Sequence, residues 1–89
     1  MSVIEEIVAE RKRQIEVEGW TPEHDDDHAE GDLARAAACY AAGELLFIDV
    51  IPLWPWSAEW WKPKGRRHDL IRAAALIVAE IERLDRASS

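Results

Sequence analysis

The sequence is poor in cysteine, and it lacks both a long apolar run and a basic stretch followed by an apolar one near its start. The single cysteine, Cys39, lies in an alanine-rich segment, which is typical of a small buried residue rather than of a disulfide framework. No apolar stretch approaches the roughly 20 residues of a membrane span, and the first residues do not have the pattern of a secretory signal. We therefore expect a protein of the reducing cytoplasm that contacts no membrane.

Residues that form nucleophilic catalytic groups are also scarce. Serine occurs only at positions 2, 57, 88 and 89, and Cys39 has no basic residue next to it in the sequence. A serine or cysteine nucleophile needs a neighbouring base to activate it. The sequence therefore assigns no catalytic residue, and we expect no resident cofactor.

Charge is unevenly distributed along the 89 residues, whose formal net charge is −7. Residues 1–45 hold twelve acidic and four basic residues, whereas residues 46–89 hold six acidic and seven basic residues. Because nucleic acid is a polyanion, a chain this acidic is a poor general nucleic-acid binder. A local anion site is still compatible with the sequence, since residues 62–72 carry five basic residues and one acidic residue.

Three segments have the apolar spacing of helices, which predicts a small all-α, three-helix domain over residues 1–89. The first helix begins with an S-x-x-E capping box at Ser2 and Glu5. It is expected to end at Gly19, because glycine suits the left-handed backbone that follows many helices. We expect the next residue, Trp20, to fold back on this helix.

The second and third helices are predicted to pack as an antiparallel pair. The second is expected from about residue 29 to residue 47, after a short acidic turn, and the third covers the apolar segment 70–84. Both are rich in alanine, which lets two helices approach closely. Pro52 and Pro55 exclude a helix between them, so a tryptophan-rich loop is expected there, with residues 47–53 as the one candidate strand.

The third helix is apolar on more sides than two neighbouring helices can cover. Its first apolar row consists of Leu70, Ala73, Ala74, Ile77, Ile81 and Leu84, and its second row of Ile71, Ala75 and Val78. This width predicts a homo-oligomer whose interface includes Ile71, Ala75 or Val78.

Four of the five tryptophans lie between residues 54 and 61, and a basic cluster follows them. The candidate ligand-binding residues are Trp54, Trp56, Trp60, Trp61, Lys62, Lys64, Arg66, Arg67 and His68. An indole offers a flat face to a nucleobase, and arginine offers paired donors to phosphate. The pattern predicts a small nucleotide-like anionic ligand. The other interpretation makes two or three of the indoles part of the core.

Arg66 and Arg67 lie where the third helix begins, and this position opposes the usual charge preference. A helix N-terminus carries a partial positive charge, so cations are unfavourable there unless an anion such as phosphate binds beside them. The arginines are equally well explained if they pair with the acidic first half of the chain.

A second group of residues suits a metal ion. The candidate ligands are His24, Asp25, His28, Asp32, Glu82 and Asp85. If the acidic segment is helical, His24, His28 and Asp32 share one face, and two imidazoles with a carboxylate bind Zn or Mn. Under this alternative the chain is a metal-dependent nucleotide pyrophosphohydrolase that needs Mg, Mn or Zn. The acidic residues also suit a helix N-terminus without any metal.

Over nearly its whole length the chain resembles a family of small, mostly uncharacterised bacteriophage and prophage proteins, at EGWTPEHDDDH, WPWSAEWWKPK and RRHDLIRAAALIVAEIERLD. It is more loosely similar to the MazG-type all-α NTP pyrophosphohydrolases, which use an EExxE helix followed by an ExxD helix. Glu5 and Glu6 match the first motif and Glu82 with Asp85 the second, but Ala9 stands where a third acid is expected.

Small phage proteins that sequester nucleotide immune signals are comparable in size and ligand chemistry, which implies an anti-defence role. A non-catalytic protein that blocks a host factor with its acidic face is a further alternative.

Overall fold

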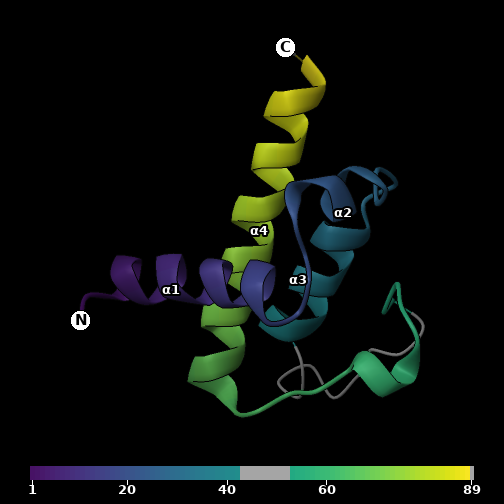
Figure 1. Ribbon diagram of the computed structural model, residues 1–89. Coiled ribbons are helices and arrows are strands. Elements are labelled where there is room, and N and C mark those ends of the chain that lie inside the picture. The colour runs from purple at the N-terminus through teal and green to yellow at the C-terminus, as the bar shows by residue number, and fades with distance from the viewer. Residues whose placement is uncertain (43–52, 89) are drawn as a thin grey trace.

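The computed structural model describes residues 1–42 and 53–88, which form an all-α fold (Figure 1). In chain order the elements are α1 (Val3–Glu16), α2 (Pro22–Asp26), α3 (Asp32–Ala42), the short 3-10 helix η2 (Ala58–Trp60) and α4 (Arg66–Ser88). No strand occurs within the described ranges, and residues 47–52 of the expected strand lie outside them. The all-α prediction is confirmed, with α2 as a short additional helix in place of the expected acidic turn.

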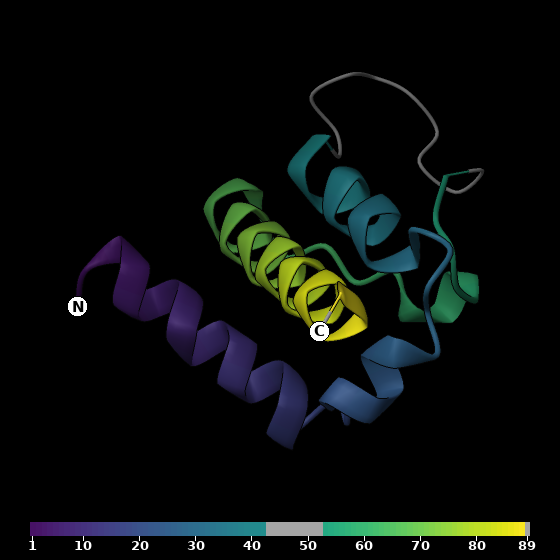
Figure 2. The same ribbon diagram turned by 90° about the horizontal axis from the view of Figure 1, so that it is seen from above.

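Helix α4 is the central element of the fold. Figures 1 and 2 show α3 antiparallel to α4 on one side, α1 crossing α4 on the other side, and α2 beside the C-terminal half of α4. The last turns of α4 project beyond the other helices (Figure 1). Because α1, α2 and α3 each contact α4, their positions are all set by its side chains.

Both ends of α1 follow from local sequence. The Ser2 hydroxyl accepts the backbone N–H of Glu5 at 3.1 Å, and the Glu5 carboxylate accepts the backbone N–H of Ser2 at 3.1 Å, which is the expected capping box. After the helix, Gly19 has a positive φ of 79°, and the backbone N–H of Trp20 donates to the Gln14 carbonyl at 2.9 Å. The Trp20 ring therefore turns back and packs against the core.

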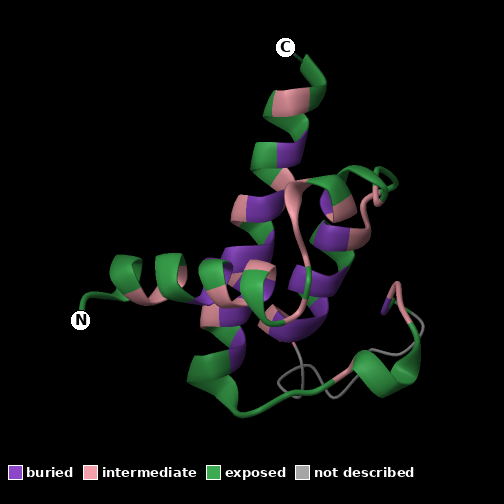
Figure 3. Ribbon diagram, in the orientation of Figure 1, coloured by how far each residue is buried: buried purple, intermediate pink, exposed green. Residues whose placement is uncertain are grey.

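The apolar core lies between α3 and α4 (Figure 3). Its buried members are Leu33, Ala36, Ala37, Cys39 and Tyr40 on α3, Ala73, Leu76 and Ala79 on α4, and Trp54 from the loop. Most of these side chains are small, so the two helices pack closely. As expected, Cys39 is buried, and burial raises the pKa of its thiol.

Helix α3 begins later than the sequence suggests. It starts at Asp32 rather than near residue 29, because the backbone at Gly31 has a positive φ of 84° and interrupts the helical path. It ends at Ala42, and residues 43–47 of the expected helix lie outside the described part of the chain.

The apolar residues of α4 divide between a buried side and an exposed side. Leu70, Ile77, Ile81 and Leu84 are 42–52% exposed, whereas Ala73, Leu76 and Ala79 are buried. Close approach of α3 requires small side chains, so the row that carries most of the large aliphatic residues faces outward. Ala75 is fully buried within the single chain, so it is not available for the predicted interface between copies.

Candidate functional site

The tryptophans of the loop divide into two pairs. Trp54 and Trp61 pack on Tyr40 of the core, with ring centroids 5.5 and 4.8 Å from the Tyr40 ring. Trp54 is only 5% exposed, and its indole N–H donates to the Ser57 carbonyl at 3.0 Å. Trp54 is therefore part of the core, and Trp61 is partly buried against it.

Trp56 and Trp60 line a pocket of about 390 Å³. The complete lining is Glu18, Trp20, His24, His28, Trp56, Ser57 and Trp60. The structure thus combines two candidate ligand-binding indoles with two candidate metal-binding histidines, and it adds Trp20. We call this feature the ring pocket.

The walls of the ring pocket are aromatic rings in mutual contact. The centroid of the Trp20 ring lies 6.4 Å from that of His24, with the two rings stacked, and 5.4 Å from that of Trp56. The centroid of the His28 ring lies 4.5 Å from that of His24 and 5.7 Å from that of Trp56. Trp60 is 49% exposed. Its wall is therefore the most accessible face for a ligand.

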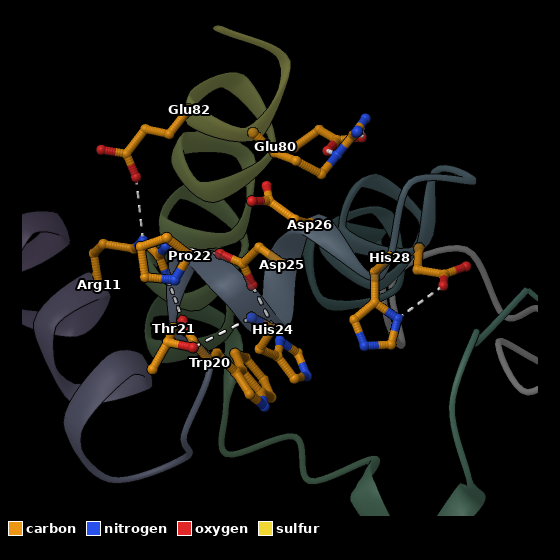
Figure 4. Close-up of polar contacts among 12 residues, drawn as sticks. Arg11, Trp20, Thr21, Pro22, His24, Asp25, Asp26, His28, Glu80 and Glu82 are labelled. Carbon is orange, nitrogen blue, oxygen red and sulfur yellow. Dashed lines mark hydrogen bonds and ion pairs between the residues drawn. The ribbon is translucent and has the colours of Figure 1, made fainter. Parts of the chain in front are cut away.

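The histidines are oriented by neighbouring carboxylates (Figure 4). His24 Nδ1 lies 3.2 Å from Asp25 Oδ1, and His28 Nδ1 lies 3.1 Å from Asp32 Oδ2. Because α2 ends at Asp26, His24, His28 and Asp32 do not share one helix as the spacing had suggested. The turn after α2 brings the two rings together instead.

Helix α2 is held in place by arginines from α1 and α4. Arg11 Nη2 donates to Asp25 Oδ2 at 2.8 Å, and Asp25 is fully buried. Arg11 also donates to the Trp20 carbonyl at 3.2 Å, and Arg86 pairs with Asp26 at 2.8 Å. Sequence analysis missed Arg11 and Arg86, since neither stands near its partner in the chain. The local sequence supports the start of α2, where the Thr21 hydroxyl accepts the His24 backbone N–H at 3.2 Å and Pro22 is the first helical residue.

The predicted phosphate donors lie at the start of α4 and already have protein partners. Arg67 forms two hydrogen bonds to the Glu6 carboxylate, at 2.8 and 2.6 Å, and Arg66 donates to the Ala41 carbonyl. The hydrogen bonds from Arg67 hold the pKa of Glu6 below its ordinary value. The interpretation that the arginines pair with the acidic half of the chain therefore describes Arg67.

The segment between η2 and α4 is held by Arg72, which is buried. Arg72 donates to the Tyr40 hydroxyl at 3.0 Å and to the Lys62 carbonyl at 2.9 Å, and its Nη2 lies 3.2 Å from His68 Nε2. The backbone N–H of Lys64 donates to Asp69 at 2.9 Å. These contacts leave the Lys62 ammonium over the Trp60 ring, 5.3 Å from its centroid.

Among residues 1–42 and 53–88, no group of three or more His, Cys, Asp or Glu side chains is arranged to hold a metal ion. The Glu82 carboxylate lies 3.4 Å from Arg11 Nε, and Asp85 is exposed. Glu6 of α1 pairs with Arg67 at the start of α4. Glu82 lies fifteen residues after Arg67 on α4, which is about 22 Å along the helix axis. The two acidic motifs shared with the pyrophosphohydrolases are therefore well separated within one chain, and the metal interpretation stays a prediction.

No helix in the described part of the chain is long and apolar enough to cross a membrane. Comparison with protein-family models, with curated proteins and with solved structures gives no match. The phage-family resemblance therefore stays a prediction, and function has to be inferred from the ring pocket itself.

Proposed function

We propose that this protein binds a small nucleotide-like ligand whose base stacks in the ring pocket. The observation that supports this function is the lining of three indoles and two imidazoles around about 390 Å³. That volume is at the small end of the usual range for ligand pockets, about 300–1,000 Å³, and suits one base with its sugar. Stacking on an aromatic side chain contributes about 1–3 kcal/mol per base.

The charges around the pocket favour a ligand with few phosphates. Glu18 is the acidic lining residue, and Arg13 partly neutralises it across 3.0 Å. The cation that contacts a pocket ring is Lys62, over Trp60. We therefore assign the phosphate contact to Lys62, with Arg66 and Arg67 engaged by Ala41 and Glu6 instead.

A calorimetric titration with nucleoside monophosphates tests this function. Trp60→Ala removes the exposed stacking wall and should weaken binding about tenfold, the effect of about 1.4 kcal/mol of lost stacking. Trp60→Phe keeps a ring and should restore most of the affinity. Val8→Ala shortens an exposed side chain on α1 (63% exposed) that lines no part of the ring pocket and serves as the control. Binding that is unchanged by Trp60→Ala would contradict the proposed site.

A second candidate function is hydrolysis of the bound nucleotide. The observation that favours it is the pair of imidazole–carboxylate contacts inside the ring pocket, since a histidine oriented by a carboxylate is the usual form of a general base or a metal ligand. Incubation with a nucleotide panel and Mg²⁺, Mn²⁺ or Zn²⁺, followed by denaturation, separates the two functions. Intact ligand identifies a binding protein, and converted ligand identifies an enzyme.

We also propose that the chain forms a homo-oligomer through the outward side of α4. The residues there are Leu70, Ala74, Ile77, Ile81 and Leu84, which we call the outer row. Their alternating spacing of four and three residues is the heptad pattern by which two helices pack side by side. Four of the five are large aliphatic residues that the single chain leaves 42–52% exposed.

A further inference from the structure

The proton positions on the two pocket histidines follow from their partners. Nδ1 of His24 lies 3.2 Å from Asp25, and Nδ1 of His28 lies 3.1 Å from Asp32. An ionised carboxylate only accepts hydrogen bonds, so each Nδ1 carries the hydrogen and donates it. In a neutral imidazole the other nitrogen, Nε2, then has a free lone pair and acts as an acceptor.

These two acceptors lie close together at one wall of the ring pocket. The rings of His24 and His28 are 4.5 Å apart, and both line the cavity. Figure 4 shows the rings side by side, with the contact to Asp25 made at one edge of the His24 ring. Because both rings line the cavity, each can offer its Nε2 lone pair to a ligand at this wall.

The other polar groups of the lining do not reverse this character. The Glu18 carboxylate is a further acceptor, and its charge partner Arg13 is not among the lining residues. The indole N–H of Trp56 is covered by protein atoms, without a hydrogen-bond partner in the described residues, so it is not exposed to a ligand. The Ser57 hydroxyl both donates and accepts. The indole N–H groups of Trp20 and Trp60 are donors, so the acceptor character belongs to the wall formed by His24 and His28.

We propose that the ring pocket selects bases that carry an exocyclic amino group over bases that carry a carbonyl at the same position. This inference rests on the proposed nucleotide-like function. An amino group has two N–H donors for the two Nε2 lone pairs, whereas a carbonyl oxygen places only further lone pairs against them. Burying acceptors that face each other leaves all of them without partners, which is costlier than losing one ordinary hydrogen bond. At the purine 6-position and the pyrimidine 4-position, adenine and cytosine carry an amino group, whereas guanine and uracil carry a carbonyl.

The test compares ligands that differ at this exocyclic group and at the adjoining ring nitrogen, which carries a hydrogen only in the carbonyl members. Adenosine monophosphate is titrated against inosine monophosphate, and cytidine monophosphate against uridine monophosphate, with the wild-type chain in a calorimeter. The amino member of each pair should bind about tenfold more tightly, as expected for one unpaired polar group. His28→Phe keeps a stacking ring but removes a lone pair, so it should reduce the preference to about twofold or less. Glu59→Gln removes an exposed acceptor that does not line the pocket and should leave the preference unchanged.

The outcomes separate the inference from the proposed function. Equal binding of all four ligands, or tighter binding of the carbonyl members, overturns the selectivity and leaves nucleotide binding in place. Binding of none of the four overturns both. The wild-type affinity ratio decides the matter by itself if His28→Phe does not fold.

Discussion

The two sides of α4 are held by different chemistry. Toward α3 the contacts are mainly apolar, with fully buried Leu76 and Leu33 among small side chains, and the hydrogen bond from Arg72 to Tyr40 is the polar exception. Toward α1 and α2 polar groups are buried, and Arg11 forms an ion pair with the fully buried Asp25. Apolar burial stabilises a fold in almost any arrangement of similar volume, whereas a buried ion pair is stable only with both partners in position. The ring pocket depends on the second kind of contact, because α2 forms part of its wall.

The Glu10 carboxylate is a second buried polar group between α1 and α4, and burial and its ion pairs shift its pKa in opposite directions. Glu10 is buried, and burial by itself raises the pKa of its carboxyl. The hydrogen bonds from Arg13, at 2.8 Å, and the charges of Arg13 and Arg72 outweigh that effect, so the pKa of Glu10 is lowered. Partners on both α1 and α4 therefore keep this buried acid charged.

The largest loss of stability is expected from Asp25→Ala. The change leaves the buried Arg11 guanidinium with only the half-exposed Glu82 carboxylate, 3.4 Å from Nε, as a charge partner, and breaking a buried ion pair in this way costs about 4 kcal/mol. Urea denaturation followed by circular dichroism measures the change in the free energy of unfolding. The double variant Arg11→Met/Asp25→Leu removes both charges and should recover most of the loss.

The matched control for that experiment is Asp26→Ala, on the neighbouring acid of α2. The Asp26 side chain is half exposed in its contact with Arg86, and surface ion pairs contribute little to stability. A loss at Asp26 as large as that at Asp25 would show that α2 itself, rather than the buried pair, limits stability.

A somewhat smaller loss is expected on the apolar side from Leu76→Ala. Leu76 is fully buried against α3, and removing a buried leucine side chain costs about 3 kcal/mol in transfer energy and cavity formation. Because α2 does not depend on this contact, affinity for a nucleotide should stay within about twofold wherever the variant is still folded. Asp25→Ala should weaken nucleotide binding as well as folding, so titration of both variants distinguishes the two sides of α4.

The smallest effect on folding is expected from Ile81→Glu in the outer row. Ile81 is 52% exposed, so the single chain should lose less than about 0.5 kcal/mol, as for surface substitutions generally. A charge in a seam between two copies is buried without a partner, and the oligomer should therefore dissociate. Sedimentation at micromolar concentration measures both proteins. A wild-type chain that sediments at its monomer mass of 10.1 kDa would rule out the outer row as an interface.

The candidate site could be predicted from the sequence only in pieces. Trp56, Trp60, His24 and His28 all stood among the candidate residues, but in two separate groups with different chemistry. Their union in one pocket depends on the turn after α2 and on the loop before α4, which are about thirty residues apart. No pattern along the chain marks that contact.

The sequence by itself determined the local features of this protein. The capping box at Ser2 and Glu5 and the left-handed backbone at Gly19 are as expected, although α1 ends at Glu16, three residues before Gly19. The reason is physical: each of these features depends on hydrogen bonds or backbone angles within a few residues of the chain.

Only the tertiary structure decided which residues face one another. Leu76 and Ile77 are adjacent aliphatic residues on the same helix, yet the first is fully buried and the second is 48% exposed. Arg11 and Arg67 are both arginines in a largely acidic chain, yet one is buried against Asp25 and the other lies on the surface with Glu6. Hydrophobicity and charge are properties of single residues, whereas burial and pairing depend on which helices approach α4, and that is set by close packing of the whole chain.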